Sequence, residues 1–386
     1  MKQPKFFSRD VILIFAACFF YMCCPTMVNS IIVGFTETVG GSGFIMGFVG
    51  GLLSLASLFC RPFAGNLADR INKARLSLIG SGLMVLACLC YLIATSPWLL
   101  VIGRILHGVG YSFCSVCMTT WFSLLIPKEK IGFGMGLYGT FQALGLAISP
   151  YFGIRLADSL GYRAAFGVAA ILAVFTLAAT LLIQDPGEPS PSNASSRSLQ
   201  LIEPSVVPIA LIISCFAIPY SATQTFLVSF VAHSGSPVHA DVFFPLYAVV
   251  LIALRLGLRN FFDRVPYHDF LFLGAASAAA AMLLLSSMNG YFQMFLAAAF
   301  MAGGYGIMCS VSQAEAIHIS GKEKRGLANS TYYIGFDLGL ALGPMVGGVL
   351  YENLDIGLFY PSFLVCSALP LLVYAICHKK MVHAYV

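Results

Sequence analysis

Long apolar stretches alternate with short polar ones along the whole chain. Each stretch, with its flanks, is long enough to cross the hydrocarbon core of a bilayer, which is about 30 Å thick and takes about 20 helical residues. We therefore predict an all-α integral membrane protein. Its twelve transmembrane helices are expected at residues 10–35, 41–64, 76–95, 98–125, 132–156, 162–183, 205–232, 240–261, 268–288, 290–318, 326–350 and 356–378.

One long polar segment interrupts this pattern near the middle of the chain. Residues 184–204 contain the Pro- and Ser-rich run DPGEPSPSNASSRS, which predicts a flexible cytoplasmic linker. The chain then divides into an N-terminal six-helix bundle, residues 1–183, and a C-terminal six-helix bundle, residues 205–386.

The two predicted bundles carry an internal repeat. When the second half is moved back by 194 residues, prolines and charged residues fall on their counterparts in several separate regions. The matches include Pro25 with Pro219, Arg61 with Arg255, Asn66 with Asn260, Asp69 with Asp263, Arg70 with Arg264, Tyr138 with Tyr332, Gly145 with Gly339 and Pro150 with Pro344. Shared apolar composition explains apolar matches but not charged loops in register, so we interpret the halves as pseudo-symmetric.

Composition agrees with a chain that lies mostly in lipid. Hydrophobic residues make up 59% of it and charged residues only 10%, whereas a soluble domain has about 25% charged residues. The net charge of +5 is spread over short loops and does not suggest nucleic-acid binding. The 12 cysteines lie mostly inside apolar runs and have no metal-binding spacing, so we expect no metal and no cofactor.

The distribution of basic residues predicts the orientation. With the N-terminus inside, cytoplasmic segments hold 15 lysines and arginines, and the outer segments hold only Arg155 and Arg163. Both termini and the linker are then cytoplasmic. We expect a multi-pass protein of a bacterial plasma membrane.

The segment between the second and third predicted helices carries the strongest motif. Residues 61–75 read RPFAGNLADRINKAR, and the run from Gly65 to Arg70 resembles the loop between helices 2 and 3 of the major facilitator superfamily. The run Arg104-x-x-x-Gly108-x-Gly110 is similar to a second motif of that family.

A further pattern resembles the drug and metabolite antiporters of that superfamily. Gly136, Gly145, Pro150 and Gly153 have the spacing of the antiporter motif in helix 5, although Ser149 and Ile154 stand where that motif usually has glycine. The resemblance implies a secondary active transporter that works by alternating access. It also implies a small-molecule substrate and protons as partners, and we expect a functional monomer.

The resemblance also suggests a gate on the cytoplasmic side. Asp69, at the end of helix 2, would meet the N-terminus of helix 11 near Gly326, where free N–H groups attract a carboxylate. The alternative is a solvated loop that only follows the distribution of basic residues. The candidate gating residues are Arg61, Gly65, Asp69, Arg70, Lys73, Asp263, Arg264 and Glu315. For Glu315 an ion pair with Arg259 or Arg264 is weighed against a place in the substrate site.

Ionisable residues inside predicted helices are costly and therefore informative. Asp337 lies about 16 Å from the start of its helix, near mid-membrane. It would either bind protons or substrate, or make a structural hydrogen bond to a neighbouring helix. Arg104 and His107 share one helix face at i and i+3, and they would either relay charge or simply satisfy helix carbonyls.

Polar side chains at helical spacing supply the remaining candidates. In the resembled fold helices 1, 5, 7 and 11 line the central cavity. The candidate substrate-binding residues on these helices are Thr26, Asn29, Tyr138, Gln142, Thr223, Gln224, Tyr333 and Asp337. Such a site is polar but weakly charged, which suits a small amphipathic organic solute.

Three functions compete at this point. The leading hypothesis is proton-coupled export of drugs or metabolites, and the alternatives are proton-coupled uptake and a membrane sensor on the same fold. No phosphate-cradling G-x-x-x-x-G-K-[ST] loop is present, which argues against ATP as the driving force. We expect no enzyme, because the chain has no H-E-x-x-H motif and no Ser/His/Asp grouping.

Overall fold

The structure is a computed structural model that describes residues 7–127, 131–188, 202–258, 265–320 and 325–382. Every regular element in these residues is a helix, as predicted. The elements are α1 (Arg9–Thr38), α2 (Gly43–Arg70), α3 (Lys73–Ile93), α4 (Pro97–Leu125), α5 (Ile131–Leu160), α6 (Tyr162–Leu181), η2 (Pro204–Val206), α7 (Val207–Ser234), η3 (Ala240–Val242), α8 (Phe243–Gly257), α9 (Tyr267–Ser286), α10 (Tyr291–Met301), η4 (Ala302–Gly306), α11 (Ile307–Ile319), α12 (Arg325–Asn353), η5 (Ile356–Leu358), η6 (Pro361–Leu364) and α13 (Val365–Val382).

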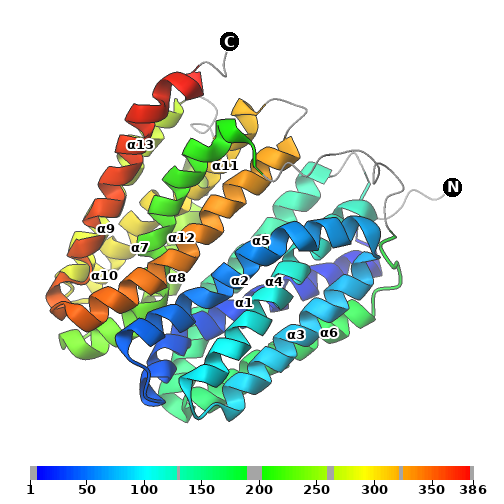
Figure 1. The fold of residues 1–386 in the computed structure, drawn as a ribbon, viewed down its shortest axis with the longest axis horizontal. Helices are drawn as coiled ribbons and strands as arrows, with labels where there is room; N and C mark the ends of the chain where they lie inside the picture. Colours follow the sequence, from blue (N-terminus) through cyan, green and yellow to red (C-terminus); the bar gives the residue numbers. More distant parts are fainter. Residues whose placement is uncertain (1–6, 128–130, 189–201, 259–264, 321–324, 383–386) are drawn as a thin grey trace. The chain divides into compact units, whose positions relative to one another are not determined.

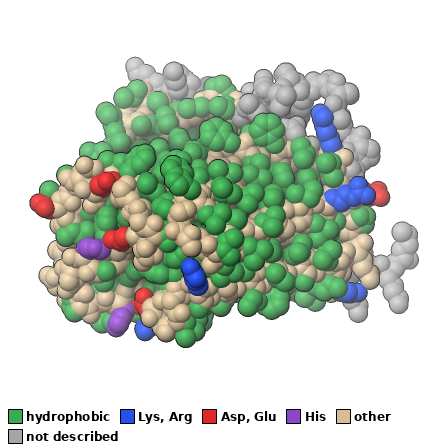
Figure 2. All heavy atoms as spheres, turned by 60° about the horizontal axis from the view of Figure 1, so that its bottom comes forward, with side chains coloured by type: hydrophobic (Ala, Val, Ile, Leu, Met, Phe, Trp, Pro, Cys, Tyr) green, Lys and Arg blue, Asp and Glu red, His purple; other side chains and the backbone are tan. Residues whose placement is uncertain are grey.

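The helices agree with twelve membrane crossings. Within the described ranges, 11 segments are long and apolar enough to span a bilayer. The remaining predicted crossing is α5, a helix of 30 residues. Figure 2 shows hydrophobic side chains over most of the visible face, with charged ones mostly toward its two ends. Large apolar side chains such as Phe59, Trp98 and Ile376 are exposed, as expected where lipid is the solvent.

The motif segment at residues 61–75 is more helical than expected. The prediction ended helix 2 at residue 64, but α2 continues to Arg70, and α3 begins at Lys73. The side chain of Asn72 accepts a hydrogen bond of 2.9 Å from the backbone N–H of Arg75 and so caps the new helix. The prediction of a loop was therefore wrong for most of this stretch, because the polar residues continue the helix past the apolar run.

The chain folds into two compact units. Unit 1 comprises residues 1–41 and 52–197, and unit 2 comprises residues 42–51 and 198–386. In Figure 1, α1 and α3 to α6 run side by side within unit 1. The first turns of α2 therefore belong with unit 2, and the rest of α2 belongs with unit 1.

Unit 2 is organised around the packing of α7 against α12. A Cβ atom added at Gly339 would lie 2.5 Å from the carbonyl oxygen of Ser214. Gly335 and Gly343, four residues to either side, make equally close approaches to the backbone of α7. The Ser214 hydroxyl donates to the carbonyl of Gly335 across the same contact. Small residues every fourth position therefore let two helix backbones touch, which is how helices associate in lipid.

Unit 1 has the same arrangement between α1 and α5. A Cβ atom at Gly145 would lie 3.2 Å from the carbonyl oxygen of Phe19, and one at Gly153 would lie 3.0 Å from that of Met27. Gly145 and Gly153 are the repeat counterparts of Gly339 and Gly347. The same helix pair is therefore in close contact in both units, which agrees with the repeat read from the sequence.

The start of α2 packs against the opposite face of α12. Gly43, Gly47 and Gly51 approach the backbone of α12 between Ala341 and Glu352. The backbone N–H of Phe44 donates a hydrogen bond of 2.7 Å to the Glu352 carboxylate. A carboxylate at a helix N-terminus is favourable because it meets free N–H groups and the positive end of the helix dipole.

The first residues after α6 are fixed to unit 1. The Asp10 carboxylate accepts hydrogen bonds of 3.2 and 3.1 Å from the backbone N–H groups of Gln184 and Asp185. The ammonium group of Lys73 donates a 2.9 Å hydrogen bond to the carbonyl oxygen of Glu188. Residues 184–188, predicted as part of a flexible linker, are thus held to the ends of α1 and α3. Residues 189–201 of that linker lie outside the described residues.

We predict that Gly339→Leu destabilises the protein by about 3 kcal/mol or more, because backbone atoms of α7 cannot rotate away from an added side chain. The midpoint of thermal unfolding of detergent-solubilised protein measures the change. Gly82→Leu is the matched control, since an added Cβ atom there meets nothing within 4 Å. Equal midpoints for the two variants would contradict the role given to this contact.

Candidate functional site

A polar cluster in unit 1 includes two of the predicted substrate-binding residues. The hydroxyls of Tyr138 and Tyr21 lie 3.3 Å apart. The amide of Gln142 donates a 2.8 Å hydrogen bond to the Tyr21 hydroxyl, and the Thr119 hydroxyl donates one of 3.4 Å to Tyr138. The cluster joins α1, α4 and α5 through uncharged groups that both donate and accept. Tyr138 and Gln142 are therefore brought together as their i, i+4 spacing predicted.

A second polar cluster in unit 1 contains the predicted charge-relay pair. Arg104, His107 and Tyr91 are fully buried. The Tyr91 hydroxyl lies 3.2 Å from His107 Nδ1 and also accepts a hydrogen bond from the Arg104 guanidinium group. The Cys24 Sγ lies 3.6 Å from both His107 Nε2 and the Cys88 Sγ. Arg104 and His107 are thus linked through a tyrosine of α3, which the sequence reasoning had not singled out.

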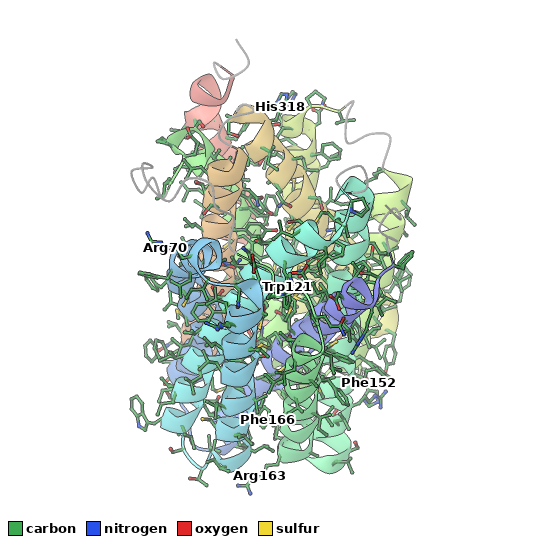
Figure 3. All side chains as sticks on the ribbon, turned by 90° about the vertical axis from the view of Figure 1, so that its right-hand side faces the viewer. Arg70, Trp121, Phe152, Arg163, Phe166 and His318 are labelled. Atoms are coloured by element: carbon green, nitrogen blue, oxygen red, sulfur yellow. The ribbon has the colours of Figure 1, made fainter. Side chains whose placement is uncertain are left out.

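Figure 3 locates this second cluster along unit 1. The figure shows Arg163 and Phe166 toward one end of the unit and Arg70 and Trp121 farther toward the other. The ring centroid of Tyr91 lies 5.5 Å from that of Phe166. The cluster around Arg104 is therefore toward the Arg163 end, which is the side predicted to face outward.

Two predicted substrate-binding hydroxyls are used inside their own helices. Thr26 donates a 2.7 Å hydrogen bond to the carbonyl of Met22, and Thr223 donates one of 2.8 Å to the carbonyl of Pro219. Both bonds run to a carbonyl four residues earlier in the same helix, so they make no contact with another helix. The carbonyl oxygen of the Asn29 side chain is buried and has no hydrogen-bond partner in the described part of the chain. Gln224 is buried on α7.

The remaining predicted substrate-binding residues lie on α12 in unit 2. Asp337 is 3% exposed and lies near the middle of this helix. Tyr333, one turn earlier, accepts a 3.3 Å hydrogen bond from the Gln313 amide, which also donates one of 2.8 Å to Asn329. The placement of Asp337 at mid-helix agrees with the sequence prediction. Its role as a proton or substrate ligand stays a prediction.

The structure describes only some of the predicted gating residues. Asp263 and Arg264 lie outside the described residues, and the side chain of Asp69 is not described. Arg70 is exposed, Arg61 and Glu315 are half-buried, and Gly65 has open space around it. Lys73 is buried, with its ammonium group on the Glu188 carbonyl. The predicted contact of Asp69 with the eleventh membrane helix near Gly326, which is α12 in the structure, therefore stays a prediction.

Comparisons with known proteins identify one family of membrane proteins. The sequence model of the Major Facilitator Superfamily matches residues 14–289 and 261–380 of the chain. Multidrug resistance protein 2 of Bacillus subtilis is 23% identical over 353 residues, covering 87% of this chain and 86% of that protein. Multidrug resistance protein MdtG of Escherichia coli is 23% identical over 388 residues, covering 95% of this chain and 93% of that protein.

Solved structures show the same fold. A mutant of the nucleoside transporter NupG superposes with a TM-score of 0.80 at 13% identity, over 95% of this chain and 99% of that chain. A POT family transporter in complex with a thioalcohol conjugated peptide superposes with a TM-score of 0.81 at 12% identity, over 98% of both chains.

We predict that Tyr91→Phe lowers the free energy of unfolding by about 1–3 kcal/mol, because the buried groups of Arg104 and His107 lose a hydrogen-bond partner. Thermal unfolding of detergent-solubilised protein measures the loss. Tyr151→Phe, at a half-buried tyrosine of α5, is the control and should unfold like the parent protein. If both variants unfolded at the midpoint of the parent protein, the hydrogen bonds of Tyr91 with Arg104 and His107 would not contribute to stability.

Proposed function

The chain belongs to the major facilitator superfamily of transporters, and from this premise we propose that it exports small organic molecules in exchange for protons. Its family and relatives are transporters and not enzymes. The relatives named multidrug resistance proteins support export of drugs or metabolites. We further propose a bacterial plasma membrane as its location, with both termini cytoplasmic, and a monomer as the functional state.

The observation that carries the proposal is the buried carboxyl group of Asp337. It lies near the middle of a membrane helix, where a charge is expensive. A carboxyl group at such a position is stable when it holds a proton or faces a positive partner. Proton binding and release at Asp337 can therefore be linked to which arrangement of the helices is favoured. That link is what a proton-driven transporter requires.

The packing around Asp337 supports such a link. Ala341, one turn further along α12, has its carbonyl oxygen against Gly51 of α2. Gly339, two residues from Asp337, contacts α7. A change in charge at Asp337 thus acts in a part of α12 that is tightly packed on two faces. Because close-packed contacts do not deform continuously, a local change there favours one discrete packing over another.

The clusters of unit 1 suggest how the solute and the charge are handled. Tyr138 and Gln142 belong to a network of uncharged donors and acceptors, which suits an amphipathic organic solute. Arg104 supplies a fixed positive charge, and Tyr91 orients it beside His107. We assign to Arg104 and His107 the role of setting the electrostatic field of unit 1, and to Asp337 the role of exchanging the proton.

We predict that Asp337→Asn leaves the fold intact but abolishes transport driven by a pH gradient. An amide has nearly the same shape as a carboxyl group but cannot release a proton. A solute identified by thermal-shift screening would be followed in proteoliposomes after a pH step. Counterflow without a gradient would be measured in parallel, because exchange of solute for solute does not require proton release.

Asp355→Asn is the matched control, since Asp355 is exposed near the start of η5. It should transport like the parent protein. Unchanged pH-driven transport in Asp337→Asn would remove Asp337 from the coupling mechanism. Loss of transport in both variants would show an effect of lost charge in general.

A further inference from the structure

A turn of π-helix interrupts a membrane segment of unit 2. Residues 291–319 form one apolar segment, in which η4 (Ala302–Gly306) separates α10 from α11. The turn reads AGGYG, so its one large side chain is Tyr305. Such turns are rare in helices and frequently mark functional sites, because they displace a side chain from its α-helical position. What Tyr305 contacts is therefore informative.

Tyr305 is stacked on a tyrosine of another helix. Its ring centroid lies 3.9 Å from that of Tyr220 on α7, with the ring planes 13° apart. Tyr247 of α8 lies 5.5 Å from Tyr220, and Phe336 of α12 lies 6.2 Å from Tyr305. The rings of four helices of unit 2 thus form one aromatic cluster. We call Tyr220, Tyr247 and Tyr305 the tyrosine triad.

The hydroxyl groups of the triad differ from those of the buried tyrosines nearest to it. The three side chains are 5%, 5% and 6% exposed in that order. Within the described residues, none of the three hydroxyls has a hydrogen-bond partner.

Neighbouring tyrosines behave differently. The Tyr332 hydroxyl donates a 2.7 Å hydrogen bond to the carbonyl of Cys309, and the Tyr267 hydroxyl lies 3.1 Å from that of Ser312. Buried tyrosines normally find such a partner, because an unpaired hydroxyl away from water costs free energy. Three unpaired hydroxyls within one aromatic cluster therefore indicate a place where an external acceptor binds.

Small residues bring the triad together. A Cβ atom at Gly306 would lie 3.1 Å from the Tyr247 hydroxyl oxygen and 2.6 Å from Leu251 Cδ1. A larger residue would push Tyr247 away from the π turn. The glycine thus keeps room for the hydroxyl of Tyr247 beside the displaced Tyr305.

The chemistry of the triad selects one class of ligand. Its flat rings favour a flat ring on the ligand, and its hydroxyls offer protons to acceptor atoms. We propose that the tyrosine triad is a solute-binding subsite of unit 2 for flat, ring-containing molecules that carry hydrogen-bond acceptors such as a carbonyl oxygen. The proposal rests on the proposed transport function, because it names part of the solute site.

The test compares two bicyclic probes of similar size. Coumarin carries a carbonyl acceptor, whereas naphthalene has no acceptor. Binding to detergent-solubilised protein is measured by saturation-transfer difference NMR and equilibrium dialysis, with empty micelles as the blank. We expect coumarin to bind more tightly than naphthalene. Equal affinities for the two probes would overturn the proposal.

Tyr→Phe variants test the hydroxyls while they keep the rings. We expect Tyr220→Phe, Tyr247→Phe and Tyr305→Phe each to weaken coumarin binding about 2- to 10-fold, as expected for one hydrogen bond, and to leave naphthalene binding unchanged. Tyr291→Phe is the matched control, since Tyr291 is exposed at the start of α10. Coumarin affinities unchanged in all three triad variants would show that the hydroxyls only meet water, and the subsite would be rejected.

The result of the binding test can be distinguished from the result of the test of proton-coupled transport. Binding is measured without a membrane or a pH gradient, so it does not depend on Asp337. Coumarin binding through the triad together with an absence of pH-driven transport would reject proton coupling and keep the subsite. The reverse result would keep proton coupling and reject the subsite.

Discussion

Close approach between helix backbones is the constraint on which the rest of this structure depends. In a bilayer, apolar side chains gain little by leaving lipid for a neighbouring helix, so association relies on dispersion contacts and on polar groups between helices. The Gly335, Gly339 and Gly343 row against α7 provides both, since it removes side chains from the contact and lets Ser214 bond to a carbonyl of the facing helix. Unit 1 repeats this between α1 and α5.

Because small residues hold the helices together, most large polar side chains are not needed for helix packing and can serve function. Many hydroxyls, such as those of Thr26 and Thr223, bond to a carbonyl one turn earlier and so add no specific contact between helices. Polar side chains that connect different helices form several networks in the described residues. They include the Tyr21–Tyr138 network and the group around Arg104 in unit 1, and the row from Gln313 to Tyr333 and the Tyr267–Ser312 pair in unit 2. Function is best sought in such places.

Much of the fold followed from the sequence because membrane helices are encoded by length and apolarity. The repeat also aligned Gly145 with Gly339, and the structure places these two glycines in equivalent contacts, with α1 and with α7. The end of α2 was misjudged, since hydropathy falls at Arg61 while the backbone remains helical to Arg70. Within the site, the i, i+4 spacing of Tyr138 and Gln142 predicted their proximity. Spacing along one helix carries no signal for partners on other helices, so Tyr21, Tyr91 and the stack of Tyr220 on Tyr305 were missed.

The π turn makes the two halves of a repeated chain inequivalent. The helix from Pro97 to Leu125 and the segment from Tyr291 to Ile319 have equal length and stay in register at the repeat offset, so Tyr305 is the counterpart of Tyr111. A π turn holds about one more residue than an α turn, so side chains beyond it point in a different direction from their counterparts. Tyr111 accordingly lies 6.0 Å from Tyr21, whereas Tyr305 stacks on Tyr220, the counterpart of Thr26. A single irregular turn of backbone thus lets a duplicated sequence present two different surfaces without any insertion or deletion.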